Sequence, residues 1–311
     1  MAACSDGAFL AGCFKCSGQM HVADGCKEIN RQRRLRKGGP CIMKDFFKLF
    51  SSFFRVAMRR EMAYRGTYLA GIVGQWICYG STFLSLYILV SGFDLLDGWN
   101  GAEVMVLYGL SLMSYALGAS FFFNFSSGLS RRIRSGEFDA SLTKPIHPFL
   151  HEVFSAGYNV GYISHFTISL VIIVIALSRL HYAPSLSNIL LLVLMVLAGS
   201  MVQAASLIAS STMSFFTVGN NPVMDFLLWD MKQFTNYPIT IFPKGIQFIL
   251  TFLLPFAFIN FYPASALLGK SIPKGYPAVL PWLSPLVGLL VLVLSILLWN
   301  WGLSHYKSTG S

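Results

Sequence analysis

The sequence predicts an all-α membrane protein that crosses the bilayer several times. Of its 311 residues, 55% are hydrophobic and 12% are charged, and an average soluble domain has about twice that share of charge. Apolar runs of about 20 residues recur, and each is long enough to cross a hydrocarbon layer of about 30 Å as a helix. These two observations exclude an ordinary soluble protein and predict about six transmembrane helices.

The cations are concentrated near the beginning of the chain. Thirteen of the 23 Lys and Arg residues precede residue 66, which predicts that this region lies on the cytoplasmic side. The basic run at 31–37 has a composition that also occurs in nucleic-acid-binding proteins. Basic residues beside membrane spans are explained by anionic lipid, so we expect the lipid bilayer as a partner and no nucleic acid.

Residues 1–42 differ in composition from the rest of the chain. The cysteines and histidine with zinc-knuckle spacing are Cys13, Cys16, His21 and Cys26. Three thiolates and one imidazole can hold a tetrahedral zinc ion, but Ser17 and Met20 occupy positions that usually carry glycine in such knuckles. We expect no metal here, and we expect 1–42 to be a disordered extension or sequence upstream of a start at Met43.

Residues 43–66 are predicted to form an amphipathic helix in the membrane interface, ahead of a six-span transmembrane domain at 67–311. One helical face carries Phe46, Phe50, Phe53, Phe54 and Ala57, and the other carries Lys48, Ser52, Arg55 and Arg59. Cations opposite phenylalanines are typical of a helix that lies in the headgroup region.

Five spans are distinct in the sequence, at about 67–90, 104–126, 153–178, 186–212 and 284–303. The loop at 91–103 carries acidic residues and no cation, so it is predicted to face outside. The loop after the second span carries Arg131, Arg132, Arg134 and Lys144, so it is predicted to face the cytoplasm. Both ends of the chain are then cytoplasmic.

The region 213–283 does not give a simple span. Asp225, Asp230 and Lys232 are too polar for a lipid-facing helix, and the apolar stretch 245–261 is broken by Pro255. A broken helix at membrane depth must be surrounded by protein or water. We therefore expect either a kinked fifth span or a re-entrant pair on the outer side.

Small residues are frequent in the fourth span, where they let helix backbones approach closely. They are Ala198, Gly199, Ser200, Ala204, Ala205, Ala209 and Ser210. The pattern leaves open whether this face packs within the chain or against a second subunit.

The spans contain few groups suited to catalysis or ion coupling. The polar candidates are Gln75, Asn124, Asn159, His165 and Gln203. Paired intramembrane carboxylates, HExxH and GxSxG are all missing from the sequence, which disfavours an enzyme and a proton-driven carrier. Gly269-Lys270-Ser271 resembles the end of a phosphate-binding loop, but the required earlier glycine is Ala264.

Residues 131–152, RRIRSGEFDASLTKPIHPFLHE, form a compact polar segment between two spans. Ser135-Gly136 is typical of a turn, and Phe138 and Leu142 lie four residues apart on one face of a short helix. These properties leave two interpretations of the segment. It is either an ordinary charged loop or a rigid surface that transmits a movement from a cytoplasmic partner to the adjacent spans.

Two segments carry a resemblance to the permease subunits of type-2 ATP-binding-cassette (ABC) exporters, in particular a bacterial six-span group. The cytoplasmic loop of that group is similar at Arg134, Gly136, Phe138, Asp139, Leu142, Lys144, Pro145 and Pro148. The segment 237–269 is similar at Tyr237, Pro238, Phe242, Pro243, Pro255, Tyr262, Pro263 and Ala264. The likeness extends over about 43–305.

The resemblance implies a transport subunit of the bacterial inner membrane that is not itself an enzyme. ATP and magnesium would bind a separate ATPase subunit, and a second permease chain, identical or related, would complete the translocation path. Contact with the ATPase would involve Arg134, Gly136, Glu137, Phe138, Asp139, Leu142, Pro145 and Pro148. An outer gate or re-entrant segment would contain Tyr237, Pro238, Phe242, Pro243, Pro255, Tyr262 and Pro263.

Other functional classes remain open from the residues. A membrane-embedded lipid-modifying enzyme would have to use Asp225 and Asp230, and a membrane scaffold would use the zinc-knuckle-like segment. A secondary carrier is a third alternative. For a transport subunit, the aromatic, weakly polar spans suit an apolar or amphiphilic solute, such as a drug, an antibiotic or a lipid.

Overall fold

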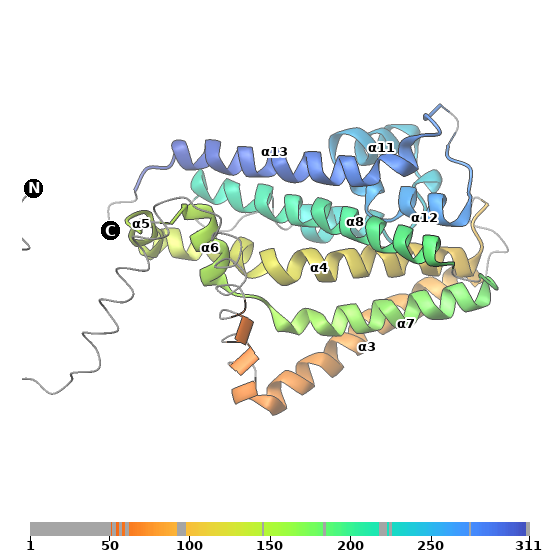
Figure 1. Cartoon of the computed structure of the whole chain (residues 1–311), viewed down its shortest axis with the longest axis horizontal. Coiled ribbons are helices and arrows are strands. Elements are labelled where there is room, and N and C mark those ends of the chain that lie inside the picture. The colour runs from red at the N-terminus through yellow and green to blue at the C-terminus, as the bar shows by residue number, and fades with distance from the viewer. Residues whose placement is uncertain are drawn as a thin grey trace, which may run out of the picture. The chain divides into compact units, whose positions relative to one another are not determined.

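Five helices run side by side along the bundle (Figure 1): α3 (Arg65–Ser91), α4 (Gly101–Arg134), α7 (Ile163–Arg179), α8 (Leu186–Thr212) and α13 (Ser284–Ser304). This computed structural model describes residues 51, 54, 55, 58, 59, 62–91, 98–144, 146–182, 185–217, 223, 226–273 and 275–308. Each of the five helices is long and apolar enough to cross a membrane, and within these ranges there is no strand element. The predicted all-α polytopic membrane protein is therefore confirmed.

The bundle has two distinct ends. At one of them, here called the α5 end, lie α5 (Glu137–Leu142), α6 (Pro148–Ala156) and the residues after α13. Toward the other, here called the α12 end, lie α11 (Lys244–Phe248) and α12 (Phe261–Leu268) (Figure 1). The predicted cytoplasmic loop therefore lies at the opposite end from the Pro-containing segment.

Helix α4 forms the centre of the bundle and is buried along most of its length, whereas α3 is mostly exposed. A capping box starts α4: Asn100 Oδ1 accepts from the Glu103 amide, and Glu103 Oε2 accepts from the Asn100 amide, both at 2.9 Å. Satisfying these amides fixes the first turn of the helix. Glu103 also forms an ion pair with Lys270 at 2.8 Å, which joins α4 to the chain beyond α12.

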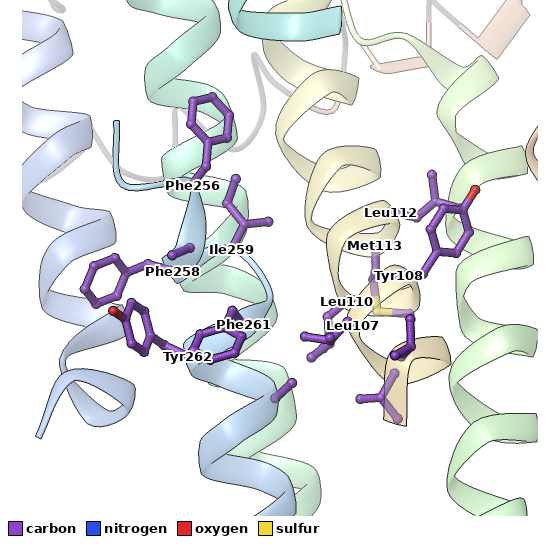
Figure 2. Close-up of a cluster of buried hydrophobic side chains, with 14 of the residues drawn as sticks. Leu107, Tyr108, Leu110, Leu112, Met113, Phe256, Phe258, Ile259, Phe261 and Tyr262 are labelled. Atoms are coloured by element: carbon purple, nitrogen blue, oxygen red, sulfur yellow. The ribbon is translucent and has the colours of Figure 1, made fainter. Parts of the chain in front are cut away.

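A large apolar core joins α4 to the segment before α12 (Figure 2). From α4, Leu107 and Leu110 are buried on the side of that segment, which contributes Phe256, Ile259 and Phe261. Tyr108 and Leu112 point from α4 toward α7. These contacts fix the segment that leads into α12 against the central helix.

Small residues determine how closely α4, α8 and α13 approach. A Cβ added at Gly199 would meet Ser114 Oγ at 2.5 Å, and one added at Gly288 would meet the Ala198 carbonyl oxygen at 2.6 Å. A methyl group cannot fit at such distances, so both positions require glycine. The small face of the fourth span thus packs within this chain, which resolves the alternatives left open by the sequence.

Span three begins later than the sequence predicts. Residues 148–156 form the separate helix α6, which ends at Gly157 with φ 75°. A left-handed backbone at that position breaks the helix. Asn159 then caps η1 (Val160–Tyr162), and the span continues as α7.

The chain between α8 and α13 consists of short pieces. These are η2 (Met213–Phe215), η3 (Phe226–Asp230), α10 (Met231–Phe234), η4 (Ile239–Ile241), α11, η5 (Ile249–Leu253), η6 (Phe256–Phe258), α12 and η7 (Leu280–Leu283). The apolar helices Lys244–Leu253 and Phe256–Leu268 are bent by 75° at the break that contains Pro255, so the described residues contain five candidate spans, or six if the pair is one. The predicted break at Pro255 is confirmed.

The bent pair does not carry the chain from one end of the bundle to the other. The Phe215 ring lies 5.4 Å from that of Phe138 at the α5 end, and Thr235 bonds to Ser111 within the bundle at 2.8 Å. The chain has therefore already passed most of the bundle before α11 begins. This placement favours the re-entrant alternative over a kinked fifth span.

Candidate functional site

The α5 end presents a short helix on a rigid base. Helix α4 ends with three arginines in its last turn, and Gly136, with φ 72°, reverses the chain before α5. Glycine adopts this left-handed conformation at little steric cost. The chain therefore turns abruptly from the central helix into the six residues of α5.

Phe138 anchors α5 to the bundle. Its side chain is fully buried, with ring centroids 5.4 Å from Phe215 and 5.1 Å from Tyr306. The same cluster contains Phe125 and Trp299, whose rings are 5.0 Å apart. The aromatic residue predicted for partner contact thus connects α5 with α4, η2 and α13 from inside.

Asp139 is held by the segment after α13. Its Oδ1 accepts from the Tyr306 hydroxyl at 3.0 Å, and its Oδ2 accepts from Ser308 Oγ at 2.7 Å. Burial, together with the hydrogen bond and charge of Asp139, raises the pKa of Tyr306 to about 12. The phenol therefore remains protonated at neutral pH and continues to donate this bond.

An ion pair positions α6 beside α4. Arg132 Nη1 contacts Glu152 Oε2 at 2.5 Å and donates to Ser155 Oγ at 3.1 Å. The Glu152 side chain is almost completely buried, so losing Arg132 would leave a costly unpaired charge. The pair keeps both sides of the α5 turn in one arrangement.

The outward face at this end combines charge with apolar side chains. Its exposed residues are Glu137, Ala140, Leu142, Thr143, Lys144, Ile146, His147 and Leu150. Lys144 Nζ lies 2.9 Å from His151 Nε2. We call this set the α5 face.

The structure brings most of the predicted coupling residues together. Gly136, Glu137, Phe138, Asp139 and Leu142 all belong to the α5 turn and helix. Arg134 is exposed at the end of α4, and Pro148 opens α6. Pro145, and the zinc-like set Cys13, Cys16, His21 and Cys26, lie outside the described residues. Their predicted roles stay predictions.

The predicted gate residues gather toward the α12 end. Pro238 and Pro243 precede η4 and α11, and Pro255 precedes η6. Phe242 packs on Phe234 with ring centroids 5.1 Å apart, while Tyr237 is partly buried against the main core. Tyr262 and Pro263 are buried in α12. Their role as a gate stays a prediction.

Three of the polar span residues predicted as candidates join segments of the bundle by hydrogen bonds. Ser164 Oγ donates to Gln75 Oε1, and Asn159 Nδ2 donates to Asn124 Oδ1 at 3.0 Å. Gln203 is buried, and its Nε2 has no hydrogen-bond partner in the described part of the chain. Gln75, Asn124 and Asn159 therefore connect neighbouring segments of the bundle.

A second polar cluster was not identified from the sequence. His165 is buried, with its ring centroid 4.3 Å from Tyr79 and 4.9 Å from Tyr162. Lys232 Nζ lies 3.3 Å from the centroid of the Tyr115 ring. Lys232 was noted as too polar for a lipid-facing span, but tyrosines spread over three segments gave no pattern by which to join them to it.

The structure also shows what the tripeptide Gly269-Lys270-Ser271, which resembles the end of a phosphate-binding loop, does in this fold. Gly269 ends α12 with φ 63°, and Lys270 donates to the Gly98 carbonyl oxygen at 2.9 Å as well as pairing with Glu103. These residues therefore connect two loops. Over the described ranges, there is also no group of three or more His, Cys, Asp or Glu residues that could hold a metal ion.

Comparisons with known proteins agree with this architecture. No curated protein and no solved structure matches the chain. Residues 76–310 match the family described as ABC-2 family transporter protein, and this range contains the bundle from the middle of α3 onward, the α5 face and the bent pair. The chain therefore belongs to the ABC-2 transporter family, as a permease-type membrane subunit.

Proposed function

We propose that this chain forms the translocation path of an ATP-driven exporter for an apolar or amphiphilic solute. Its energy comes from a separate ATPase subunit, which binds ATP and magnesium and docks on the loop 131–148. The observation that carries the proposal is the α5 face, an exposed surface on a helix anchored from inside by Phe138. Membership of the ABC-2 family also supports a permease chain that works with a separate ATPase subunit.

Packing contacts connect the α5 face to the adjacent helices, so a movement of α5 driven by the ATPase can be transmitted to them. A force on Glu137 and Leu142 reaches α13 through Phe138 and through the Asp139–Tyr306 hydrogen bond. It reaches α6 through the turn and the Arg132–Glu152 pair. An ATPase that binds one arrangement of these elements more tightly shifts the permease toward that arrangement.

A second permease chain completes the path in this proposal. Helix α3 leaves large apolar side chains exposed, among them Leu69, Trp76 and Ile77. Such a surface suits either lipid or another apolar helix. The compartment we propose is a bacterial inner membrane, with the α5 end in the cytoplasm.

A pull-down tests the ATPase contact. The tagged full-length chain is purified from its native membranes in mild detergent, and the co-purifying material is assayed for ATP hydrolysis. We expect an ATP-hydrolysing subunit to be recovered, and we expect the double variant Glu137→Ala and Leu142→Ala to release it. Both side chains are exposed, so their removal leaves the buried Phe138 anchor intact.

The matched control is the double variant Ser304→Ala and Lys307→Ala, which changes two exposed residues at the same end but outside the α5 face. It should retain the ATPase. Failure to recover any ATPase with well-folded wild-type protein would refute the proposal. Equal loss from both double variants would refute the assignment of the α5 face.

A further inference from the structure

Lys232 occupies an unusual place for a cation. It lies on α10, and its ammonium is 3.3 Å from the Tyr115 ring centroid and 5.3 Å from that of Tyr79. Tyr115 is 14 residues beyond Gly101, or about 21 Å along α4 at 1.5 Å per residue. His165, which packs beside Tyr79, is on α7. It lies about 8 Å along the third candidate span, which begins at Val160. Both residues thus lie well inside their candidate spans, so the ammonium is at membrane depth, away from both ends of the bundle.

The charge of Lys232 is not neutralised by the described residues around it. Within the described ranges, no carboxylate oxygen lies within 4.0 Å of its ammonium, and all the described ion pairs of Arg, Lys and His are formed elsewhere. The side chain is only partly buried. A cation inside a membrane is costly and is normally paired or directed toward a functional path.

The surroundings fit an anion with an apolar body. Two tyrosine rings stabilise the ammonium through cation–π contacts. A ring face supplies no oxygen acceptor, so these two contacts leave the N–H donors able to bond to an anion. Tyr79 is partly buried beside the ammonium, and its hydroxyl is a further donor for the same group. Phe234, two residues from Lys232, is partly buried and supplies apolar surface.

We propose that Lys232 binds the anionic group, carboxylate or phosphate, of the solute that this subunit carries. The proposal rests on the proposed function, because the solute meets Lys232 only if this chain forms the path. It narrows the solute from any amphiphile to one with a single anionic group on an apolar or aromatic body. A charge-assisted hydrogen bond in a low-dielectric site gives a preference of roughly tenfold or more over a neutral analogue.

Binding of a matched pair of probes tests this. The full-length chain is placed in nanodiscs of phosphatidylcholine at pH 7 and titrated with 11-(dansylamino)undecanoate or with its methyl ester, with empty discs as the blank. The two probes share one apolar body and differ in the charge. We expect the carboxylate to bind the wild type at least about tenfold more tightly than the ester.

Variants then assign the preference to Lys232. Lys232→Met should bring the two probes within about twofold of each other, with ester affinity unchanged, whereas Lys232→Arg should keep the preference. Lys244→Met is the matched control, since Lys244 is exposed at the start of α11, away from the tyrosines. It should leave the preference intact.

Equal binding of carboxylate and ester to the wild type would overturn the proposal, and this comparison needs no variant to fold. A preference that persists in Lys232→Met would also overturn it. The assay uses no ATPase, so its outcome is independent of the pull-down. Recovery of the ATPase together with equal probe binding would refute the anion selectivity alone.

Discussion

At the scale of single residues, the structure depends on a few positions where one extra atom does not fit. Gly199 is the clearest case, because an added Cβ would lie 2.5 Å from Ser114 Oγ and 2.9 Å from the Ile259 carbonyl oxygen. The Ile259 oxygen belongs to backbone and cannot move away as a flexible side chain can. α8 therefore approaches both α4 and the segment before α12 through this one position.

Gly199→Ala should lower the stability of the protein by about 1–3 kcal/mol, the usual cost of overpacking a core. Thermal unfolding in detergent, followed by the loss of the monodisperse elution peak, measures the effect. Gly74→Ala is the control, because a Cβ at Gly74 in α3 meets nothing within 4 Å. Equal midpoints for the two variants would show that α8 is less tightly packed than described.

At the scale of elements, α5 is stable because other elements hold it. Six residues are too few for a helix to persist alone. The Phe138 side chain is inserted into the aromatic cluster, and the segment after α13 bonds to Asp139. The last span is thereby connected directly to the helix proposed to receive the ATPase.

Tyr306→Phe removes the hydroxyl and keeps the ring contacts with Phe138 and Phe215. The lost hydrogen bond is worth about 1 kcal/mol, so local opening of α5 should become roughly fivefold more frequent. Hydrogen–deuterium exchange of the amides in 137–142 measures this. Tyr158→Phe, a tyrosine outside the contacts of α5, serves as the control, and unchanged exchange in Tyr306→Phe would rule out the restraint.

At the scale of the bundle, its two ends have different chemistry. Arginines and the α5 face lie at one end, and α11 and α12 lie toward the other (Figure 1). An excess of cations marks the cytoplasmic side. Because the chain passes through the bundle before α11, both flanks of the bent pair should reach the same, outer side.

Cysteine labelling tests this topology. In a background with all six cysteines replaced by serine, Lys244→Cys and Ser271→Cys should react with an impermeant maleimide on intact cells. Ser135→Cys should react only after permeabilisation. All three residues are exposed. Reaction of Lys244→Cys and Ser271→Cys from opposite sides would identify the bent pair as a kinked span.

The sequence alone determined the class of protein, the approximate positions of five spans and the break at Pro255, although it placed the start of the third span too early. These follow from local properties, namely the length of apolar runs and the conformational limits of proline. The position of the turn before α5 also followed, since Ser135-Gly136 and the charges around it are contiguous. The likeness to ABC-2 permeases rested on this segment together with 237–269, each of which is contiguous in the sequence.

Only the tertiary structure decided how distant residues meet. Phe138 is an inner anchor because Phe215 and Tyr306 surround it, and Asp139 is bonded by residues 167 and 169 positions later. Lys232 became a candidate site because tyrosines from α3 and α4 converge on it. Packing between helices sets such contacts, and periodicity within one helix carries no information about which faces meet.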